Sequence, residues 1–216
     1  IRSQTGKPIQ QILGFAYFMG EKFKINENVL IPRDETEILV REAVSVIQSF
    51  NKPKILDIGV GSGCISCMVS RLLKDLELQI LGVDISTSAL KVAIDNVMEK
   101  VDSNRVILRK SDIFSNVNEK FDVIISNPPY INEGETLQKE LTFEPKLALF
   151  APEDGLYFYK KIINEAPKYL NNGGYILFEL GINQACSIKD FLKENFSDIS
   201  VTKDLAGIER VIKAKF

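Results

Sequence analysis

Residues 54–63 have the sequence Lys-Ile-Leu-Asp-Ile-Gly-Val-Gly-Ser-Gly, in which a short apolar run is followed by glycines at alternate positions. The apolar run, 54–58, predicts a buried strand, and the segment that follows, 62–74, predicts a helix. Glycines between a strand and a helix favour a tight loop whose backbone a ligand can approach closely. The stretch therefore predicts an α/β protein with a ligand-binding loop at the carboxyl end of its first strand.

The alternation of strand and helix continues to the end of the chain. This pattern predicts a mostly parallel sheet with helices on both faces. The last two strands are separated by only a short turn, which predicts an antiparallel hairpin at one edge. We expect seven strands, at 54–58, 79–83, 106–109, 121–126, 175–180, 199–203 and 209–215, and helices at 62–74, 88–100, 155–170 and 184–195, the third of which should stop at Gly173 and Gly174.

Residues 1–33 differ from the rest because glycines and prolines separate two short runs, 15–18 and 22–25. These runs predict a small β-hairpin with a glycine-containing turn. We therefore divide the chain into a linker and hairpin, 1–33, and the α/β domain, 34–216. A further helix is expected at the start of that domain, with Asp34 as its N-cap and Glu37 completing a capping box.

The composition excludes several kinds of chemistry. The 216 residues include no histidine, which excludes Ser-His-Asp catalysis and imidazole metal sites, and no metal is expected. The net charge of −2 argues against stable nucleic-acid binding. Few cysteines and no apolar run of membrane-spanning length indicate a cytoplasmic protein. Cys64 and Cys67 are expected to pack within one helix.

The spacing of the glycines distinguishes between nucleoside cofactors. Nicotinamide enzymes use Gly-x-Gly-x-x-Gly, and Cys64 stands where the last glycine of that pattern would be. Residues 57–63 instead follow Asp-x-Gly-x-Gly-x-Gly, which resembles the cofactor loop of Rossmann-like methyltransferases. Asp84, at the end of the next predicted strand, can accept hydrogen bonds from both ribose hydroxyls. The expected cofactor is therefore S-adenosylmethionine.

Asn127-Pro128-Pro129-Tyr130 directly follows a predicted strand, at the end where open α/β sheets bind ligands. An NH2 group has two donors, and the Asn127 side-chain oxygen and the Pro128 carbonyl can accept one each. Two fixed acceptors orient the nitrogen and stabilise the positive charge that develops on it, without a titrating base. The prolines stiffen the loop, and Tyr130 can stack on a planar group. The motif predicts methylation of an amide or an exocyclic amine nitrogen.

These motifs and several other segments resemble the release-factor glutamine N5-methyltransferases, the HemK/PrmC family, over essentially the whole chain. The other segments are Gln11-Ile12-Leu13-Gly14, Ile-Pro-Arg-Asp-Glu-Thr-Glu at 31–37, Phe143-Glu144-Pro145, Asp154-Gly155-Leu156 and Asp204-Leu205-Ala206-Gly207. The resemblance implies a Rossmann-like class I methyltransferase. Its substrate would be the side-chain amide nitrogen, N5, of the glutamine in the Gly-Gly-Gln motif of bacterial class 1 peptide chain release factors.

The resemblance also implies a set of site residues in this chain. Asn127, Pro128, Pro129 and Tyr130 would bind the glutamine, and Asn127, Pro128 and Tyr130 would be catalytic. The implied contacts with S-adenosylmethionine are Gly59, Val60, Gly61, Ser62, Gly63, Asp84, Ile113 and Asn127. We expect the protein to act as a monomer.

The chain departs from the family at two places. Family members often carry Trp where Ile113 stands, and Glu-His-Gly where Glu179-Leu180-Gly181 stands. The family also has a small helical domain ahead of the hairpin, and we expect this chain to hold at most its trailing edge. Because that domain helps to dock the release factor, weak binding of the partner is expected.

Two alternatives remain open. Arg33 and Glu35 either serve in helix capping and surface ion pairs or border the methionine end of the cofactor. The alternative function is methylation of an exocyclic amine of DNA or RNA, such as adenine N6. That reaction needs a surface that grips a strand, and the sequence contains neither a basic run nor an inserted recognition region.

Overall fold

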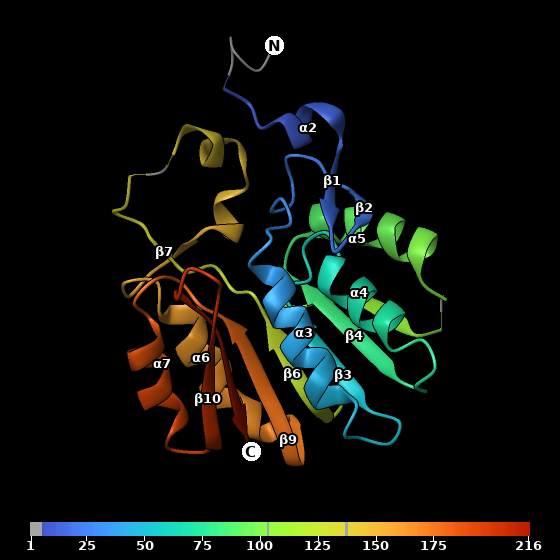
Figure 1. The fold of residues 1–216 in the computed structure, drawn as a ribbon, viewed down its shortest axis with the longest axis vertical. Helices are drawn as coiled ribbons and strands as arrows, with labels where there is room; N and C mark the ends of the chain where they lie inside the picture. Colours follow the sequence, from blue (N-terminus) through green and yellow to red (C-terminus); the bar gives the residue numbers. More distant parts are fainter. Residues whose placement is uncertain (1–5, 103, 137) are drawn as a thin grey trace.

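A seven-stranded sheet forms the centre of the molecule, as the sequence predicts (Figure 1). The structure is a computed structural model that describes residues 6–102, 104–136 and 138–216, so the first five residues of the predicted linker lie outside the described residues. The strand order is β10-β11-β9-β6-β3-β4-β5. The strands from β9 to β5 are parallel, whereas β11 is antiparallel to both of its neighbours. The predicted fold class is confirmed.

The elements follow the predicted order closely. The strands of the sheet are β3 Lys54–Ile58, β4 Gln79–Asp84, β5 Val106–Lys110, β6 Phe121–Ser126, β9 Leu170–Glu179, β10 Ser197–Lys203 and β11 Glu209–Lys215. The α-helices are α2 Ile9–Leu13, α3 Thr36–Ile47, α4 Cys64–Leu72, α5 Thr87–Lys100, α6 Tyr157–Glu165 and α7 Ala185–Leu192. Short pairs are formed by β1 Phe15–Phe18 with β2 Glu21–Lys24 and by β7 Ile131–Asn132 with β8 Phe150–Ala151, and 3-10 turns occupy Lys139–Phe143, Lys146–Ala148 and Ala166–Lys168.

Helices cover both faces of the sheet. On one face, α3, α4 and the end of α5 pack against Val123 and Ile125 of β6. On the other face, α6 and α7 pack against Ile124 of the same strand. Successive side chains of a strand point to opposite faces, so one apolar strand serves two cores. The helices leave the carboxyl ends of the parallel strands uncovered.

The C-terminal hairpin enters the sheet in an order that the sequence did not specify. The last strand, β11, lies between β9 and β10, so β10 is the edge strand. Val211, Ile212 and Ala214 of β11 are buried, whereas no residue of β10 is fully buried. The more apolar strand occupies the inner position because both of its faces are covered there.

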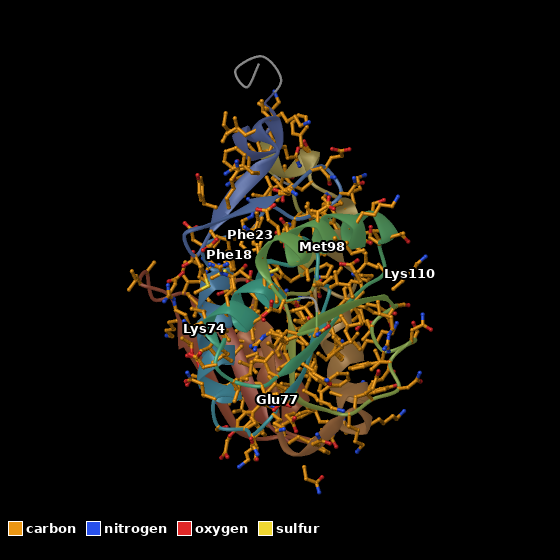
Figure 2. The ribbon with its side chains drawn as sticks, turned by 90° about the vertical axis from the view of Figure 1, so that its right-hand side faces the viewer. Phe18, Phe23, Lys74, Glu77, Met98 and Lys110 are labelled. Carbon is orange, nitrogen blue, oxygen red and sulfur yellow. The ribbon has the colours of Figure 1, made fainter. Side chains whose placement is uncertain are left out.

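The predicted N-terminal hairpin is confirmed, with its second strand one residue earlier than expected. Phe18 and Phe23 are buried in the same core as α3 and α4, and Figure 2 shows both where the hairpin meets the body of the molecule. The Asn96 side chain of α5 accepts a hydrogen bond from the Lys24 N–H at 2.8 Å and donates one to the Lys24 carbonyl at 2.9 Å. The hairpin therefore shares the core of the α/β domain, and the boundary at residue 33 stays a prediction.

The predicted N-cap at Asp34 is wrong. The helix α3 begins at Thr36, and Glu35 occupies the cap position with helical φ and ψ of −61° and −35° and no side-chain cap hydrogen bond. The Glu37 carboxylate accepts the Met19 N–H of the hairpin turn at 2.7 Å instead of closing a capping box. The Glu37 side chain therefore makes a tertiary contact instead of the local capping contact that the sequence predicts.

The predicted helix 155–170 is too long at both ends. Gly155 has φ +80°, a left-handed conformation that is not part of a helix, and α6 starts at Tyr157. At the other end, Pro167 lies in a 3-10 turn after α6.

The glycine pair assigned to the helix stop has another role. Gly173 and Gly174 lie inside β9, beside a register shift where β9 pairs with β6. A Cβ on Gly174 would lie 2.8 Å from the Asn171 carbonyl oxygen, so glycine is needed where the strand is bulged.

Three features near the carboxyl ends of the parallel strands were not predicted. They are α2, the β7–β8 pair and the two 3-10 turns between β7 and β8. The segment from β7 to β8 rises above the carboxyl ends of the strands, on the side where α2 and the hairpin also lie (Figure 1). Within the described part of the chain, no helix has the length and apolarity required to cross a membrane.

Candidate functional site

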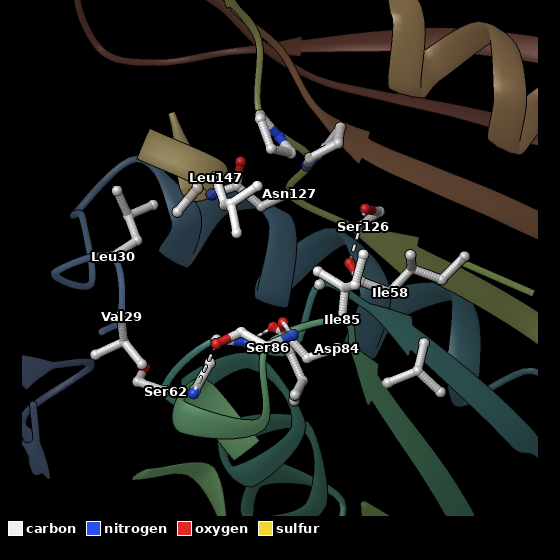
Figure 3. A pocket seen from close by; sticks show the side chains of 18 of the residues that line it. Val29, Leu30, Ile58, Ser62, Asp84, Ile85, Ser86, Ser126, Asn127 and Leu147 are labelled. Carbon is white, nitrogen blue, oxygen red and sulfur yellow. Dashed lines mark hydrogen bonds between the residues drawn. The ribbon is translucent and has the colours of Figure 1, made fainter. Parts of the chain in front are cut away.

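A cavity lies at the carboxyl ends of β3, β4 and β6, the place at which open α/β sheets bind ligands. Figure 3 shows Asp84 and Asn127 on opposite sides of this cavity, with Val29 and Leu30 at its edge. The predicted site residues that line the cavity are Gly59, Val60, Gly61, Ser62, Asp84, Ile113, Asn127, Pro128 and Pro129. The two predicted motifs thus meet around one space, and the binding role of each residue stays a prediction.

The glycine loop is held by backbone hydrogen bonds from the neighbouring strand. The N–H groups of Gly59 and Val60 both donate to the Val83 carbonyl, at 2.8 and 3.0 Å. Gly59 and Gly61 have φ of +78° and +54°, in the left-handed region that favours glycine. A Cβ on Gly59 would meet only the Asn127 carbonyl oxygen, at 3.9 Å, so the space in front of the loop is open to a ligand.

Gly63 does not line the cavity and has a packing role. It stands at the start of α4 with φ +82°, and a Cβ there would lie 3.4 Å from Cα of Ala93 on α5. The third glycine of the motif therefore lets two helices approach each other, whereas the first two leave room for a ligand.

Asp84 stands at the end of β4 and is fixed from two directions. One carboxylate oxygen accepts the Gly61 N–H at 3.0 Å, and the other accepts the Ser86 N–H at 2.8 Å. Burial raises the pKa of Asp84, and these hydrogen bonds oppose the rise. A carboxylate has about four acceptor positions, so lone pairs remain for the two hydroxyls of a ribose. Ile113, buried with φ +51°, forms an apolar part of the same wall.

Asn127 follows β6, whose last residue, Ser126, donates to the Ile58 carbonyl of β3 at 2.8 Å. The Asn127 amide nitrogen Nδ2 donates to the hydroxyl of Thr36 at 3.4 Å. Since Nδ2 faces Thr36, the oxygen Oδ1 points the other way and is the atom offered to a ligand. Thr36 itself is 3% exposed and also lines the cavity.

Tyr130 does not line the cavity. Its hydroxyl donates to a carboxylate oxygen of Glu179 at 3.5 Å, and its backbone carbonyl accepts a hydrogen bond from the Gln184 side chain at 3.0 Å. A Cβ on Gly155 would lie 2.0 Å from the same Tyr130 carbonyl oxygen, so that residue must be glycine for the loop to pass. The tetrapeptide is thus supported from behind by residues far away in the sequence.

Glu179 is the functional candidate that the sequence did not identify. It ends β9, is 2% exposed, and one of its oxygens, Oε2, has no hydrogen-bond partner among the described residues. Burial raises the pKa of Glu179 to about 7, and the hydrogen bond from the Tyr130 hydroxyl opposes the rise. The available signal was an acidic residue at the carboxyl end of a parallel strand.

The outer walls of the cavity come from two loops that the sequence did not assign to the site. Val29, Leu30 and Pro32 line it from one loop, and Pro145, Leu147 and Ala148 line it from the other. Their motifs at 31–37 and 143–145 carried part of the family resemblance, but nothing in their residue types predicts contact with the cavity.

A buried carboxylate ties these two loops together. Arg33 forms an ion pair with Glu144, which is 5% exposed and also accepts the Ile31 N–H at 2.8 Å. Glu35 pairs with Arg210 at 3.5 Å. Neither Arg33 nor Glu35 lines the cavity, so the ion-pair interpretation describes both, although the partner of Arg33 is buried.

The two neighbouring cysteines lie where the sequence predicted. Cys64 and Cys67 are both buried in α4, and burial raises the pKa of each thiol to about 12. Thiols with such values are protonated at neutral pH and behave as small apolar side chains.

Comparison with known proteins identifies the family. The family model described as "Methyltransferase small domain" matches residues 35–144. The release factor glutamine methyltransferase of Clostridium botulinum is 41% identical over 215 residues, which cover 96% of this chain and 75% of that protein. The chain belongs to the release factor glutamine methyltransferase family. Another member, from Fusobacterium nucleatum, is 43% identical over 222 residues, and this chain spans 62% of its length.

Solved structures similar to this member of the release factor glutamine methyltransferase family share its fold. A methyltransferase from Pyrococcus furiosus superposes with a TM-score of 0.67 at 17% identity, covering 100% of this chain and 98% of that one. The hMettl16 catalytic domain, crystallised with a MAT2A 3'UTR hairpin, gives a TM-score of 0.72 at 16% identity, covering 100% of this chain and 80% of that one. At such identities the likeness establishes the methyltransferase fold alone.

Proposed function

We propose that this chain transfers a methyl group from S-adenosylmethionine to the side-chain amide nitrogen, N5, of the glutamine in the Gly-Gly-Gln motif of class 1 peptide chain release factors. The observation that carries the proposal is the orientation of Asn127. Its Nδ2 is held by Thr36, so an acceptor oxygen is offered at the cavity opposite Asp84 and the glycine loop. The names of the relatives support the choice of a release factor glutamine over other amide nitrogens.

The cavity fits the proposed cofactor in two respects. The open space in front of Gly59 and Gly61 admits a ligand against the backbone, and Asp84 keeps lone pairs for ribose hydroxyls. Ile113 and Val60 would cover the base, and Ser62 and Asn127 would complete the contacts. S-adenosylmethionine supplies an electrophilic methyl group when bound. Gly63, which packs against α5, supports the loop, and its contact with the ligand stays a prediction.

The chain's own contribution is to orient an unreactive amide. Its nitrogen is a poor nucleophile because the lone pair is delocalised into the carbonyl. Asn127 Oδ1 and the Pro128 carbonyl accept the two N–H bonds, which fixes the nitrogen and disperses the positive charge that develops on it. Pro128 and Pro129 have no N–H and restrict φ, so both acceptors stay in place. Tyr130, held behind the loop by Glu179 and Gln184, supports the motif.

The test uses labelled S-adenosylmethionine with four acceptors: a release factor, its variant with the Gly-Gly-Gln glutamine changed to alanine, duplex DNA and single-stranded DNA. We expect label on the unaltered release factor only. Label on DNA would favour the exocyclic-amine alternative, and label persisting on the altered factor would show that another residue is methylated. Mass spectrometry of the labelled peptide locates the methyl group on N5.

Three accompanying expectations belong to the same proposal. The chain acts as a monomer, does not bind nucleic acid stably, and works in the cytoplasm, where release factors are found. Light scattering after gel filtration tests the first, since a mass of twice 24.3 kDa would contradict it. A gel-shift titration with RNA and DNA tests the second.

A further inference from the structure

Three segments that are far apart in the sequence meet at the end of the Asn-Pro-Pro-Tyr motif. They are the motif itself, at 127–130, the turn at 153–155 before α6, and Gln184 at the start of α7. Figure 1 shows β7, which follows the motif, beside α6 and α7. Gln184 occupies the cap position of α7, but its side chain makes no cap hydrogen bond. The side chain reaches the other two segments instead.

The side-chain amide of Gln184 uses both of its polar atoms. Its nitrogen Nε2 donates to the Tyr130 carbonyl at 3.0 Å and to the Asp154 carbonyl at 3.3 Å. Its oxygen Oε1 accepts the Gly181 N–H at 3.1 Å. An NH2 group has two hydrogens to donate, so both are committed. The reversed amide would place Oε1 against two carbonyl oxygens, which cannot donate, so the orientation of this side chain is fixed by its neighbours.

The peptide group between Tyr130 and Ile131 is held at both of its polar atoms. Its carbonyl accepts the hydrogen bond from Gln184, and its N–H donates to the Leu149 carbonyl at 2.9 Å. A peptide group is planar, so holding the carbonyl and the N–H fixes the whole unit. The two prolines that precede Tyr130 restrict φ. A displacement of this peptide group would therefore be carried back to the proposed acceptor atoms of the motif.

The turn at 153–155 has an unfavourable backbone conformation. Glu153, Asp154 and Gly155 have φ of +55°, +55° and +80°, and the left-handed region disfavours the first two because they carry a Cβ. A Cβ on Gly155 would lie 2.0 Å from the Tyr130 carbonyl oxygen and 2.6 Å from Nε2 of Gln184. The turn thus passes close to the Tyr130 carbonyl and brings the Asp154 carbonyl to Gln184. Such strain persists only where surrounding contacts hold it.

We propose that Gln184 is a positioning residue that holds the Tyr130 carbonyl against the turn at 153–155 and thereby sets the place of the two acceptors for the substrate amide. The inference rests on the proposed function, because it concerns how the glutamine nitrogen is presented to the methyl group. Gln184 does not line the cavity, so it acts through the backbone of the motif. A misplacement of about 1 Å in a reacting group can cost about 100-fold in rate, so a modest shift of the loop is enough to matter.

The main experiment compares the wild type with Gln184→Met and Gln184→Glu. Methionine has a similar length and makes neither hydrogen bond, whereas an ionised glutamate keeps an acceptor for the Gly181 N–H but has no donor for the two carbonyls. We expect both variants to lower kcat roughly 10- to 100-fold, because both release the Tyr130 carbonyl. The KM for S-adenosylmethionine should change less than about threefold, since the cofactor side is untouched. The exposed Gln48, after α3, supplies the matched controls Gln48→Met and Gln48→Glu.

The division between kcat and KM separates positioning from structural support. Active sites are counted by cofactor binding, so that kcat refers to folded enzyme alone. A residue that only stabilises the fold would lower the melting temperature and the number of sites, and would leave kcat per site unchanged. Gln184→Met with a kcat per site within about twofold of the wild type would overturn the inference. So would full activity of Gln184→Glu, because that variant lacks the donor to which the role is assigned.

A second readout does not need turnover. With 13C-carbonyl tyrosine and 15N-isoleucine, carbon–nitrogen coupling marks the two places where Tyr precedes Ile, Tyr130-Ile131 and Tyr175-Ile176. The signals are assigned through the loss of one in Tyr175→Phe. We expect Gln184→Met to move the Tyr130 carbonyl signal, which loses a hydrogen bond, and to leave the Tyr175 signal in place.

This measurement also separates the two proposals. A wild type that binds S-adenosylmethionine but methylates no release factor would refute the proposed function, and the carbonyl signal would still test the anchor. A Tyr130 carbonyl signal that is the same in the wild type and in Gln184→Met would show that Gln184 does not hold the motif, and the inference would fail.

Discussion

The side of the cavity proposed for the cofactor and the side proposed for the substrate are built by different means. On the cofactor side, the glycine loop is held by the Val83 carbonyl, and its Gly61 N–H bonds to Asp84, 23 positions away. On the substrate side, Asn127 is oriented by Thr36, 91 positions away, and the motif is backed by Glu179 from a third element. The first side is mostly backbone geometry within one β-α-β unit, and the second is a side-chain network.

This difference predicts how substitutions on each side should affect the protein. Backbone hydrogen bonds persist when a side chain is changed, so the cofactor loop should fail mainly through steric or conformational strain. A buried side-chain network loses direction when one member is replaced, because the remaining groups find other partners. Substitutions on the substrate side should therefore reduce catalysis, and substitutions on the cofactor side should reduce affinity.

The largest expected effect is that of Asn127→Ala. It removes the acceptor that orients the amide, so methyl transfer to a release factor should fall by about 10³-fold or more. The cofactor Kd, measured by calorimetry, should rise less than about tenfold, because the glycine loop and Asp84 are intact. The control is Asn132→Ala, a partly exposed asparagine of β7 that is bonded to Asp154. Turnover retained by Asn127→Ala would remove this residue from the reaction.

Next in size is Asp84→Asn. The change places an NH2 group among the Gly61 and Ser86 donors and removes the charge that we propose to hold the ribose hydroxyls. We expect the Kd for S-adenosylmethionine to rise roughly 10- to 100-fold, the range for a hydrogen bond to a charged group, with kcat at saturating cofactor nearly unchanged. Asp75→Asn, on the surface, serves as control. A fall in kcat alone would contradict the division between the two sides.

A matched pair of glycines tests the steric part of the comparison. Gly59→Ala and Gly20→Ala replace residues that share a φ of +78°, and neither Cβ would meet a protein atom closer than 3.9 Å. Both should lose about 1–2 kcal/mol of unfolding free energy from the left-handed conformation. Only Gly59→Ala should also weaken cofactor binding, by several-fold, because its Cβ enters the cavity. Equal affinities in the two variants would show that the ligand does not approach Gly59.

The smallest effect on transfer is expected from Asn96→Ala, which tests whether the cofactor side is wholly local. The Asn96 amide bonds to both backbone groups of Lys24 and to the Ser62 carbonyl of the glycine loop, at 2.8–2.9 Å. Its loss should cost roughly 2–4 kcal/mol of stability in chemical denaturation, because buried backbone groups lose their partners. Cofactor affinity should fall only a few-fold. The exposed Asn195→Ala should change neither quantity.

Much of the fold could be predicted because its signals are local. The apolar runs of β3 and β6 and the loop between β3 and α4 are each visible within a dozen residues. The errors arose where distant contacts override local preference. Glu37 bonds to the hairpin instead of capping α3, and Gly174 serves a strand bulge instead of a helix end.

The candidate site divides in the same way. The sequence predicted the cavity residues of the glycine loop and of 127–129. It could do so because the carboxyl ends of parallel strands lie on the same side of a sheet. Glu144 and Glu179 were not, because a lone glutamate in a sequence carries no sign of burial or of its partner. Tyr130 and Gly63 belong to the predicted segments but do not line the cavity, because the Tyr130 hydroxyl bonds to Glu179 and Gly63 packs against α5.

The sequence by itself determined the order of strands and helices and the open loop before α4, and it carries the proposed acceptor chemistry at 127–129, because these depend on periodicity, glycine and residue type. Tertiary structure alone decided that β11 lies inside the sheet, that Arg33 and Glu144 join the two loops, and that the Asn127 amide contacts Thr36. Those features depend on which groups are buried together, and burial makes hydrogen-bond partners obligatory.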